Sequence, residues 1–370
     1  MKQALIKKQK IPKNIHTGKN ITIKCNNLKL GKNVILSDNV KLYGETINIA
    51  DNSQIGPNTI IKSKIIKIGS NTIIESDCDI FSVNKFTIGN RSNLCEAQIV
   101  GREISIGNDF FSSVPTGKKF FVGGGGALLP TSHLTIGDRC TVHDIMINIA
   151  KPVYIGNDVG ISGEVNFYTH YFWNSIFKGY PNKFASIKIS DGCIIGAKSL
   201  FLPGVELNNN VIVGAGSIVT KSFPPNSIIG GNPAKLIREF FPKQLSKKDQ
   251  IKLLKKTLEW YTQILKTKGY SVKKDGASGL RFHINKNEKN TILSHSTKLK
   301  KTDDFAIIFS FQKIKNPQNS VLINLNDKSI HGIEDELTDD LRDFLRKIGI
   351  RIFTQRKFRS IPVKLDFQIE

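Results

Sequence analysis

A short motif recurs along this chain of 370 residues: an aliphatic residue, then a small residue, then a turn former. Successive copies lie 18 to 20 residues apart, except for two longer intervals of 30 and 34 residues. In the last copies a step of six residues is also visible. A fixed period of this length predicts a solenoid, in which each repeat stacks on the next. The copies begin at Leu30, Ile49, Ile68, Ile88, Ile106, Ile136, Ile155, Ile189 and Leu207.

The six-residue step suits a short strand followed by a tight turn. Its aliphatic residue points inward and stacks on the equivalent residue of the next coil, while Gly, Asn and Asp adopt turn conformations that β-branched residues avoid. Three steps make one coil of about 18 residues, and adjacent coils lie about 4.8 Å apart. The repeat therefore predicts a mainly β chain folded as a parallel β-helix, which is stabilised by contacts between neighbouring coils.

The segment 189–238 contains IIGA, LPGV, VGAGSIV, PPNSI and GNPAK in this order. With these motifs it resembles the last coils of the hexapeptide-repeat acyltransferases, of the sugar or polysaccharide O-acetyltransferase type. The resemblance covers about residues 20–240. It implies a left-handed parallel β-helix, assembly as a homotrimer, and transfer of an acetyl group from acetyl-CoA to a hydroxyl or an amine.

The repeat stops near residue 241, and this divides the chain. Residues 1–241 are predicted to form the β-helix acyltransferase domain. Residues 242–269 have apolar side chains at helical spacing and are predicted to form an amphipathic helix, which in relatives caps the open end of the prism. Residues 270–370 are predicted to form a small α+β accessory domain, with strands in 304–312, 320–326 and 350–356 and a helix in 335–349.

Basic residues outnumber acidic ones by 54 to 31, which gives a net charge of +23, and the excess is uneven. Residues 242–301 hold 16 basic and 4 acidic residues, whereas residues 302–370 hold 11 of each. No recognisable nucleic-acid motif accompanies the charge, so we expect no nucleic-acid partner. Three interpretations of the basic segment stay open: a solvated lysine face, attraction of an acidic glycan acceptor, and peripheral contact with an anionic membrane surface.

The cysteines, the histidines and the hydropathy of the sequence predict where the protein resides and whether it binds a metal. The five Cys are scattered, which argues against a disulfide framework. The sequence contains neither a secretory signal nor an apolar run long enough for a transmembrane helix, so we expect a cytoplasmic protein. It contains no CxxC and no spaced set of His ligands, so we expect no metal.

The two longer intervals predict loops that leave the solenoid, and function concentrates in such loops on rigid scaffolds. The second interval contains His170, at the point where a strand leaves its coil. Acyl transfer to a hydroxyl needs a base for the hydroxyl proton, and imidazole titrates near neutral pH. In relatives a catalytic His lies in a loop of this kind, so the resemblance assigns the general base to His170.

His143 is the alternative base, because Asp144 follows it. Adjacent side chains of a strand face opposite ways, however, so we do not expect this carboxylate to orient the ring. The aromatic residues beside His170, among them Tyr171 and Trp173, have two open interpretations: they cover the acceptor sugar or the pantetheine arm, or they anchor the loop.

The glycine run 123–126 lies in the first long interval. It lacks the G-K-[ST] ending of a nucleotide phosphate loop. We therefore predict a flap that closes over donor or acceptor. The flap is expected to be rimmed by Phe110, Phe111, Phe120 and Phe121.

The last coils supply the candidate donor site. Small residues let backbone amides approach the pantetheine chain and the diphosphate, and basic side chains suit the 3′-phosphate of the donor. In relatives these coils line the coenzyme A groove. The resemblance thus assigns acetyl-CoA binding to Gly196, Ala197, Gly214, Ala215, Ser217, Lys221, Lys235 and Arg238.

Together these features predict an acetyl-CoA-dependent O-acetyltransferase that modifies a hydroxyl of a sugar or of a capsular or surface polysaccharide. Transfer is expected to be direct, with a His general base and an active site between subunits. Two alternatives stay open. One is N-acetylation of a nucleotide-linked amino sugar, and the other is a non-catalytic β-helix scaffold that presents the C-terminal domain.

Overall fold

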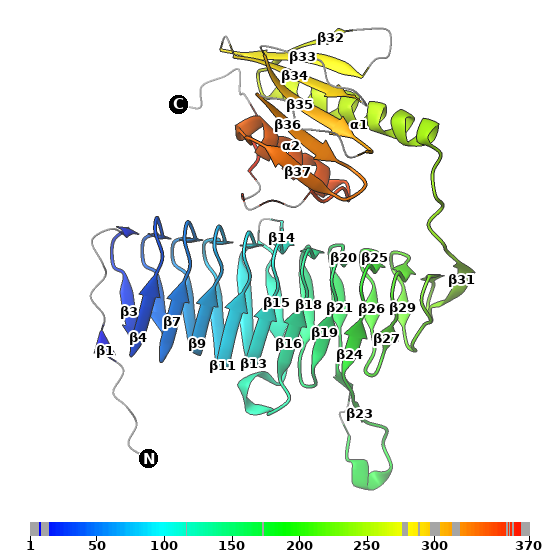
Figure 1. Ribbon diagram of the computed structural model, residues 1–370. Helices are drawn as coiled ribbons and strands as arrows, with labels where there is room; N and C mark the ends of the chain where they lie inside the picture. The colour runs from blue at the N-terminus through cyan, green and yellow to red at the C-terminus, as the bar shows by residue number, and fades with distance from the viewer. Residues whose placement is uncertain are drawn as a thin grey trace. The chain divides into compact units, whose positions relative to one another are not determined.

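The computed structural model (Figure 1) describes residues 7–8, 15–115, 117–171, 174–275, 280–287, 289–296, 304–312, 319–352, 354, 356 and 359–363. The chain divides into two compact units, residues 1–241 and residues 242–370. The division falls where the six-residue repeat stops.

The N-terminal unit is a solenoid of parallel strands with three faces (Figure 1). Each regular coil contributes one strand segment to each face, and equivalent segments of successive coils pair in parallel. Thr22 pairs with Lys41, and Ile35 with Gln54, which in both cases lies one coil of 19 residues further on. The prediction of a mainly β chain of stacked parallel coils is confirmed, and the left-handed twist of the coils stays a prediction.

The strands of the solenoid fall into three sets, named here faces one, two and three. Face one contains β3 (Thr22–Cys25), β6 (Lys41–Tyr43), the first parts of β9 (Ile60–Ile68), β11 (Asp79–Ile88) and β13 (Ala97–Ile106), then β15 (Phe120–Gly123), β18 (Ile145–Asn148), β21 (Val165–Phe167), β26 (Leu200–Phe201) and β29 (Ile218–Val219). Face two contains β4 (Asn27–Leu30), β7 (Thr46–Ile49), the second parts of β9, β11 and β13, then β16 (His133–Ile136), β19 (Val153–Ile155), β24 (Ile187–Ile189) and β27 (Glu206–Leu207). Face three contains β2 (His16–Thr17), β5 (Ile35–Leu36), β8 (Gln54–Ile55), β10 (Ile73–Ile74), β12 (Asn93–Leu94), β14 (Phe111–Ser112), β17 (Thr141–Val142), β20 (Gly160–Ile161), β25 (Ile194–Ile195), β28 (Ile212–Val213) and β30 (Ser227–Gly230). Two antiparallel strands flank these faces, β1 (Lys7–Lys8) beside β3 and β31 (Lys235–Glu239) beside β30.

The solenoid is stabilised by equivalent residues of successive coils, which stack on one another. The aliphatic residues that mark the repeat are buried inside it, and together they form one continuous core. At one turn, asparagines adopt positive φ and form a ladder: the Asn20 side chain donates to Asn39 at 3.1 Å, and Asn39 donates to Asn58 at 3.0 Å. Asparagine adopts this conformation more readily than most residues, so the turn formers of the sequence specify the corners.

Two loops leave the solenoid between face one and face two. The glycine loop (residues 124–132) joins β15 to β16 and contains the short helix η1 (Gly126–Leu128). The outlet loop (residues 168–186) joins β21 to β24 and contains β22 (His170–Tyr171), η2 (Ile176–Lys178) and β23 (Lys183–Phe184). In Figure 1 both loops project from the same edge of the solenoid. A further insertion, residues 113–119, lies between β14 and β15.

The prediction that four Phe rings surround the glycine loop is wrong for two of them. Phe110 and Phe120 are fully buried, and their rings meet edge to face with centroids 6.0 Å apart. They belong to the solenoid core because both occupy inward positions of their coil.

The C-terminal unit is a six-stranded sheet that packs against two helices. Its strands follow chain order, with β34, β35 and β36 parallel and the other neighbours antiparallel. The elements are α1 (Lys247–Thr267), β32 (Ser271–Asp275), β33 (Arg281–Lys286), β34 (Lys289–His295), β35 (Phe305–Ser310), β36 (Ser320–Asn324), β37 (Ser329–Gly332) and α2 (Glu336–Lys347). Thus the helix predicted in 335–349 is present, as are strands in 304–312 and 320–326, whereas the described residues 350–352 form no strand.

Helix α1 is part of this second core, and the cap on the solenoid that the resemblance implies stays a prediction. Leu254, Leu258, Tyr261 and Leu265 are buried in the same cluster as side chains of the sheet and of α2. The apolar stripe of the helix is therefore already covered within residues 242–370. None of the helices that the structure describes is long and apolar enough to cross a membrane.

Candidate active site

The edge between face one and face two collects the unusual features of the solenoid. It is called the His170 edge, and it comprises the glycine loop, residues 149–152, the outlet loop, residues 202–205 and residues 220–222. Phe167 pairs with Phe201 and Phe201 with Val219, so equivalent corner residues lie one coil apart along this edge. By the same pairing, Lys221 lies two coils beyond Thr169. At the ordinary strand spacing, this is a separation of about 10 Å along the solenoid.

His170 begins β22 of the outlet loop and is held by a two-stranded ribbon. β22 pairs antiparallel with β23, which places His170 opposite Phe184. The two rings stack with centroids 5.3 Å apart and planes 13° from parallel. The ring nitrogen Nδ1 of His170 lies 3.0 Å from Oδ1 of Asn148. The imidazole is therefore held by a ring face and by a hydrogen bond.

The contact with Asn148 determines which ring nitrogen of His170 carries the proton. The same Asn148 oxygen accepts from the backbone N–H of Ala150 at 3.1 Å and from the Thr169 hydroxyl at 2.7 Å. A backbone N–H only donates, so the atom it meets is the amide oxygen and not the amide nitrogen. Nδ1 of a neutral His170 must then donate to it, which leaves the lone pair on Nε2.

Asn148 itself is fixed by buried neighbours. It ends β18 and is 7 % exposed, and Thr169 beside it is fully buried. The Thr169 hydroxyl accepts from the backbone N–H of Lys151 at 3.1 Å and donates to Asn148. Because both ends of the Thr169 hydroxyl are engaged, hydrogen bonds are donated from Lys151 to Thr169 and from Thr169 to Asn148, and His170 donates to the same Asn148 oxygen.

The glycine loop packs against the other side of Asn148. A Cβ at Gly124, whose φ is +75°, would overlap the Asn148 amide nitrogen. The loop is held near this place by two hydrogen bonds, from Arg102 to the Ala127 carbonyl at 3.1 Å and from the Thr131 hydroxyl to the Ala150 carbonyl at 2.9 Å. Asn148 therefore lies between the two loops that interrupt the repeat.

Asn148 is absent from the sequence prediction. The signal that would have found it is an Asn at the end of a strand in the segment INIA, between isoleucines that are both fully buried. A buried polar side chain needs a partner, and here the partners are the residues that open the outlet loop.

His143 lies at a different edge, between face three and face one. Val142 pairs with Ile161, and Ile161 with Ile195, so His143 occupies the corner equivalent to Ser162 and Gly196. Its ring is exposed, and Asp144 is buried beside Gly163. Within the described part of the chain, the His143 ring has no hydrogen-bonding side-chain partner. As the sequence predicts, Asp144 does not orient this ring.

The aromatic residues of the outlet loop are largely exposed. Tyr171 is 45 % exposed at the end of β22, and Phe177 and Tyr180 also face solvent. Phe184 is engaged with His170. Trp173, the second predicted acceptor-binding residue, lies outside the described residues. Of the aromatic side chains near His170, Phe184 and Tyr171 are thus the two placed on the ribbon that holds it.

The small residues assigned to the donor lie at the edge of His143, not at the His170 edge. Gly196 and Gly214 follow β25 and β28, with Ala197 and Ala215 after them. A Cβ at Gly196 would overlap the Ala215 backbone nitrogen, so close stacking of coils requires this glycine. Ser217 is fully buried, and its hydroxyl donates to the Gly214 carbonyl at 2.5 Å, so this hydroxyl stabilises the turn.

The three predicted basic residues are exposed but are not all at one edge. Lys221 lies at the His170 edge, with its ammonium 5.8 Å from the centroid of the Phe223 ring. Lys235 and Arg238 lie on β31, which pairs with β30 on face three. The Arg238 guanidinium lies 5.9 Å from the centroid of the Phe240 ring.

The cysteines offer this edge no reactive thiol. All five thiols are buried, and burial raises the pKa of Cys78 to about 12 and that of Cys193 to about 11. A buried thiol with a raised pKa is a poor nucleophile. Among the residues that the structure describes, no group of three or more His, Cys, Asp or Glu side chains is arranged to hold a metal ion.

Comparisons with known proteins show which proteins the repeat is similar to. Residues 186–221 match the model of a family described as bacterial transferase hexapeptide (six repeats). A Schizosaccharomyces pombe protein named as an acetyltransferase is 33% identical over 133 residues, which is 35% of this chain and 55% of that protein. A 2,3,4,5-tetrahydropyridine-2,6-dicarboxylate N-acetyltransferase of Staphylococcus aureus is 36% identical over 76 residues, which is 20% of this chain and 32% of that protein. A solved structure of a hexapeptide-repeat-containing acetyltransferase from Vibrio cholerae shares 24% identity over 37% of this chain and 74% of that chain, with a TM-score of 0.31.

The family model and the curated relatives confirm the resemblance of the repeat to hexapeptide-repeat acetyltransferases. The family model matches 36 residues, from 186 to 221, which include the motifs IIGA, LPGV and VGAGSIV. The chain spans about half the length of the first of these curated relatives and about a third of the second.

Proposed function

We propose that this chain is an acetyl-CoA-dependent O-acetyltransferase that modifies a hydroxyl of a sugar or polysaccharide, with His170 as general base. The observation that supports this most is the hydrogen bond between His170 Nδ1 and Asn148 Oδ1, which leaves Nε2 as the proton acceptor. The confirmed resemblance of the repeat to acetyltransferases supports the choice of donor.

In the proposed reaction, Nε2 of His170 takes the proton of the acceptor hydroxyl while the hydroxyl oxygen attacks the carbonyl carbon of the acetyl thioester. The carbonyl oxygen becomes an oxyanion, which backbone N–H groups of the site stabilise. When the tetrahedral intermediate collapses, the C–S bond breaks and the imidazolium returns the proton to the leaving thiolate. Asn148 accepts from Nδ1–H throughout, so it stabilises both the neutral and the charged ring.

The proposed donor site is shared between two copies of the chain. His170 and Lys221 lie at one edge of the solenoid, whereas Gly196, Gly214 and Ala215 lie at the next edge, one face away. A single chain therefore does not bring the small-residue edge to His170. In a homotrimer, the small-residue edge of one copy would face the His170 edge of its neighbour, and the donor would lie between them.

The test measures both products of transfer. Purified chain is incubated with acetyl-CoA and a panel of neutral and acidic glycans, and free thiol is followed together with the mass of each glycan. We expect thiol release above background and a gain of one acetyl group that mild alkali removes, as an ester requires. Release of no thiol above background with any glycan would contradict the proposal.

N-acetylation of a nucleotide-linked amino sugar is the second candidate, favoured by the likeness to the named N-acetyltransferase. The same base and donor serve both reactions, because the amine proton is also lost as the nitrogen attacks. An acetyl group that resists mild alkali and appears on a soluble amino sugar would favour this candidate. Failure of calorimetry to detect any binding of coenzyme A would instead favour a non-catalytic scaffold.

A further inference from the structure

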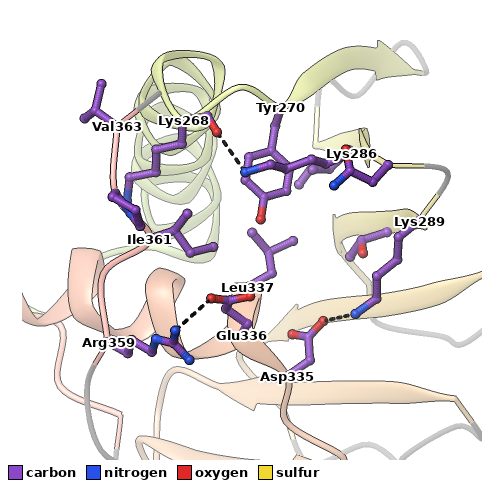
Figure 2. A pocket seen from close by; sticks show the side chains of 14 residues that line it. Lys268, Tyr270, Lys286, Lys289, Asp335, Glu336, Leu337, Arg359, Ile361 and Val363 are labelled. Carbon is purple, nitrogen blue, oxygen red and sulfur yellow. Dashed lines mark hydrogen bonds and ion pairs between the residues drawn. The ribbon is translucent and has the colours of Figure 1, made fainter. Parts of the chain in front are cut away.

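The C-terminal unit contains a cavity of about 650 Å³. Its walls come from the end of α1, from β33 and β34, from the start of α2 and from residues 359–363 (Figure 2). The volume falls within the range of about 300–1,000 Å³ that is usual for ligand sites. Ile284, Leu337, Ile361 and Val363 provide apolar surface, and charged side chains alternate with them.

Three of the four cations that line the cavity are paired with carboxylates. Lys289 lies 3.2 Å from Asp335, and Arg359 lies 3.4 Å from Glu336, and Figure 2 shows both pairs beside the cavity. The Lys268 ammonium is buried against Asp340. Asp340 also accepts from the Tyr261 hydroxyl at 3.0 Å and from the backbone N–H of Ile361 at 2.6 Å, so this pair is part of the core.

The fourth cation, Lys286, is different. Its ammonium donates to the Lys268 carbonyl at 3.0 Å and lies 4.5 Å from the centroid of the Tyr270 ring. Figure 2 shows the side chain extended across that ring. Within the described residues Lys286 makes no ion pair, although it is half-buried. A carbonyl and a ring face compensate the desolvation of an ammonium only in part, so an anion in the cavity would be bound favourably.

The remaining polar groups of the cavity are suited to hydrogen bonds with the hydroxyls of a sugar. The Lys289–Asp335 and Arg359–Glu336 pairs each offer a donor beside an acceptor, which matches neighbouring hydroxyls of a pyranose ring. Burial, and then Glu336, Asp340 and Asp335, raise the pKa of Tyr270 to about 12, so its hydroxyl stays protonated and able to donate. The apolar side chains between these groups suit the C–H faces of a sugar.

We infer that this cavity binds an acidic saccharide, with the sugar carboxylate on the Lys286 ammonium and the ring hydroxyls on the two ion pairs. Such a site would hold an acidic glycan on the same chain as the acetyl-transfer site. The role as an anchor for the acceptor rests on the proposed function, whereas binding itself does not depend on acetyl transfer.

The test measures binding to the full chain by calorimetry, in the absence of acetyl-CoA. The probes are trigalacturonic acid, the neutral maltotriose, and inorganic phosphate. We expect saturable binding of trigalacturonic acid, and binding of maltotriose and phosphate at least tenfold weaker. Lys286→Gln should weaken trigalacturonic acid binding at least fivefold, Lys286→Arg should restore most of it, and the control Lys252→Gln on the exposed face of α1 should change it less than twofold.

The His170→Ala variant separates this inference from the proposed function. It should bind trigalacturonic acid as the wild type does, because His170 is not part of the cavity. Absence of saturable binding, binding of maltotriose or phosphate as tight as that of trigalacturonic acid, or an equal loss in Lys286→Gln and Lys252→Gln would each overturn the inference. Absence of acetyl transfer by the wild type, with trigalacturonic acid still bound, would leave the cavity assigned and would count against the proposed function alone.

Discussion

At the scale of single residues, one amide determines what His170 is able to do. Asn148 presents only its oxygen to the ring, because Thr169 and the Ala150 N–H donate to the same atom. An imidazole with the opposite tautomer would place a proton where the acceptor hydroxyl must deliver one. We therefore treat Asn148 as a positioning residue, which acts on the reaction through His170.

Asn148→Ala should lower kcat by about 10- to 100-fold, in the range of a lost partner of a catalytic group. KM for acetyl-CoA should change less than threefold, because Asn148 does not contact the proposed donor groove. Steady-state kinetics of thiol release provide the measurement, with thermal unfolding as a control for stability. A rise in KM with kcat unchanged would show that Asn148 serves binding and not the orientation of His170.

Sequence reasoning found His170 but not its partner, for a physical reason. His170 stands in a break of the period, where a functional side chain is expected. Asn148 stands inside a regular coil, where Asn residues elsewhere in this chain form turn ladders. Its role follows from the outlet loop returning to the end of β18, which is a contact over 22 residues that no local pattern records.

At the scale of elements, the glycine loop and the outlet loop act on the same amide. The repeat locates both loops, because they lengthen its period. It does not predict that the glycine loop lies against Asn148, nor that Phe110 and Phe120 are core residues, because both depend on the register of neighbouring coils. The stacked parallel coils were thus predictable from the period alone, and the loop contacts were not.

Gly124→Ala should lower acetyl transfer at least tenfold, because the new Cβ would overlap the Asn148 amide. Gly117→Ala is the matched control: its φ of +79° resembles the +75° of Gly124, but nothing lies within 4 Å of its Cβ position. Both substitutions bear a backbone strain of about 1–2 kcal/mol. Equal activity of the two variants, measured by thiol release, would show that the glycine loop does not act through Asn148.

Helix α2 makes the C-terminal unit sensitive to acid. Burial raises the pKa of Asp343, but Arg346 and hydrogen bonds from Lys347 and Ser360 outweigh it and hold the value at about 2, below the ordinary 3.8. A depressed carboxyl pKa stabilises the fold above the unfolded value, and this stability is lost as pH falls from about 4 through about 2. The contribution is on the order of 2 kcal/mol at neutral pH.

Asp343→Asn should therefore destabilise the C-terminal unit near neutral pH, and the gap from the wild type should narrow as pH falls from about 4 to about 2. Urea unfolding followed by fluorescence provides the measurement, because the Trp260 ring lies edge-on to Phe344 of α2 with centroids 5.2 Å apart. A gap that stays constant over this pH range would contradict the role of the Asp343 carboxylate.

At the scale of the whole molecule, the solenoid and the C-terminal unit each have a hydrophobic core of their own. The aliphatic core of the solenoid and the core of residues 242–370 are separate clusters, and each unit has its own internal contacts. The composition change near residue 241 indicates this division. It does not indicate that α1 belongs to the second core, because an amphipathic helix shows that it needs a partner but not which partner it finds.

Calorimetry should resolve two unfolding transitions, since each core is expected to unfold as a unit. Phe167→Ala in the solenoid and Phe309→Ala in the C-terminal unit each remove a fully buried ring, at a cost of about 3–5 kcal/mol. Each variant should lower the Tm of one transition and leave the other in place. A common shift of both transitions would show that the two cores unfold together.

The central claim is that His170, oriented by Asn148, removes the proton of an acceptor hydroxyl during acetyl transfer. Its most direct test compares kcat for thiol release from acetyl-CoA, with the best acceptor of the glycan panel, in the wild type, His170→Ala and His143→Ala. We predict that His170→Ala loses about 10²–10⁴-fold in kcat, as removal of a general base does, and that His143→Ala stays within threefold of the wild type. Full activity of His170→Ala together with loss of activity in His143→Ala would contradict the account.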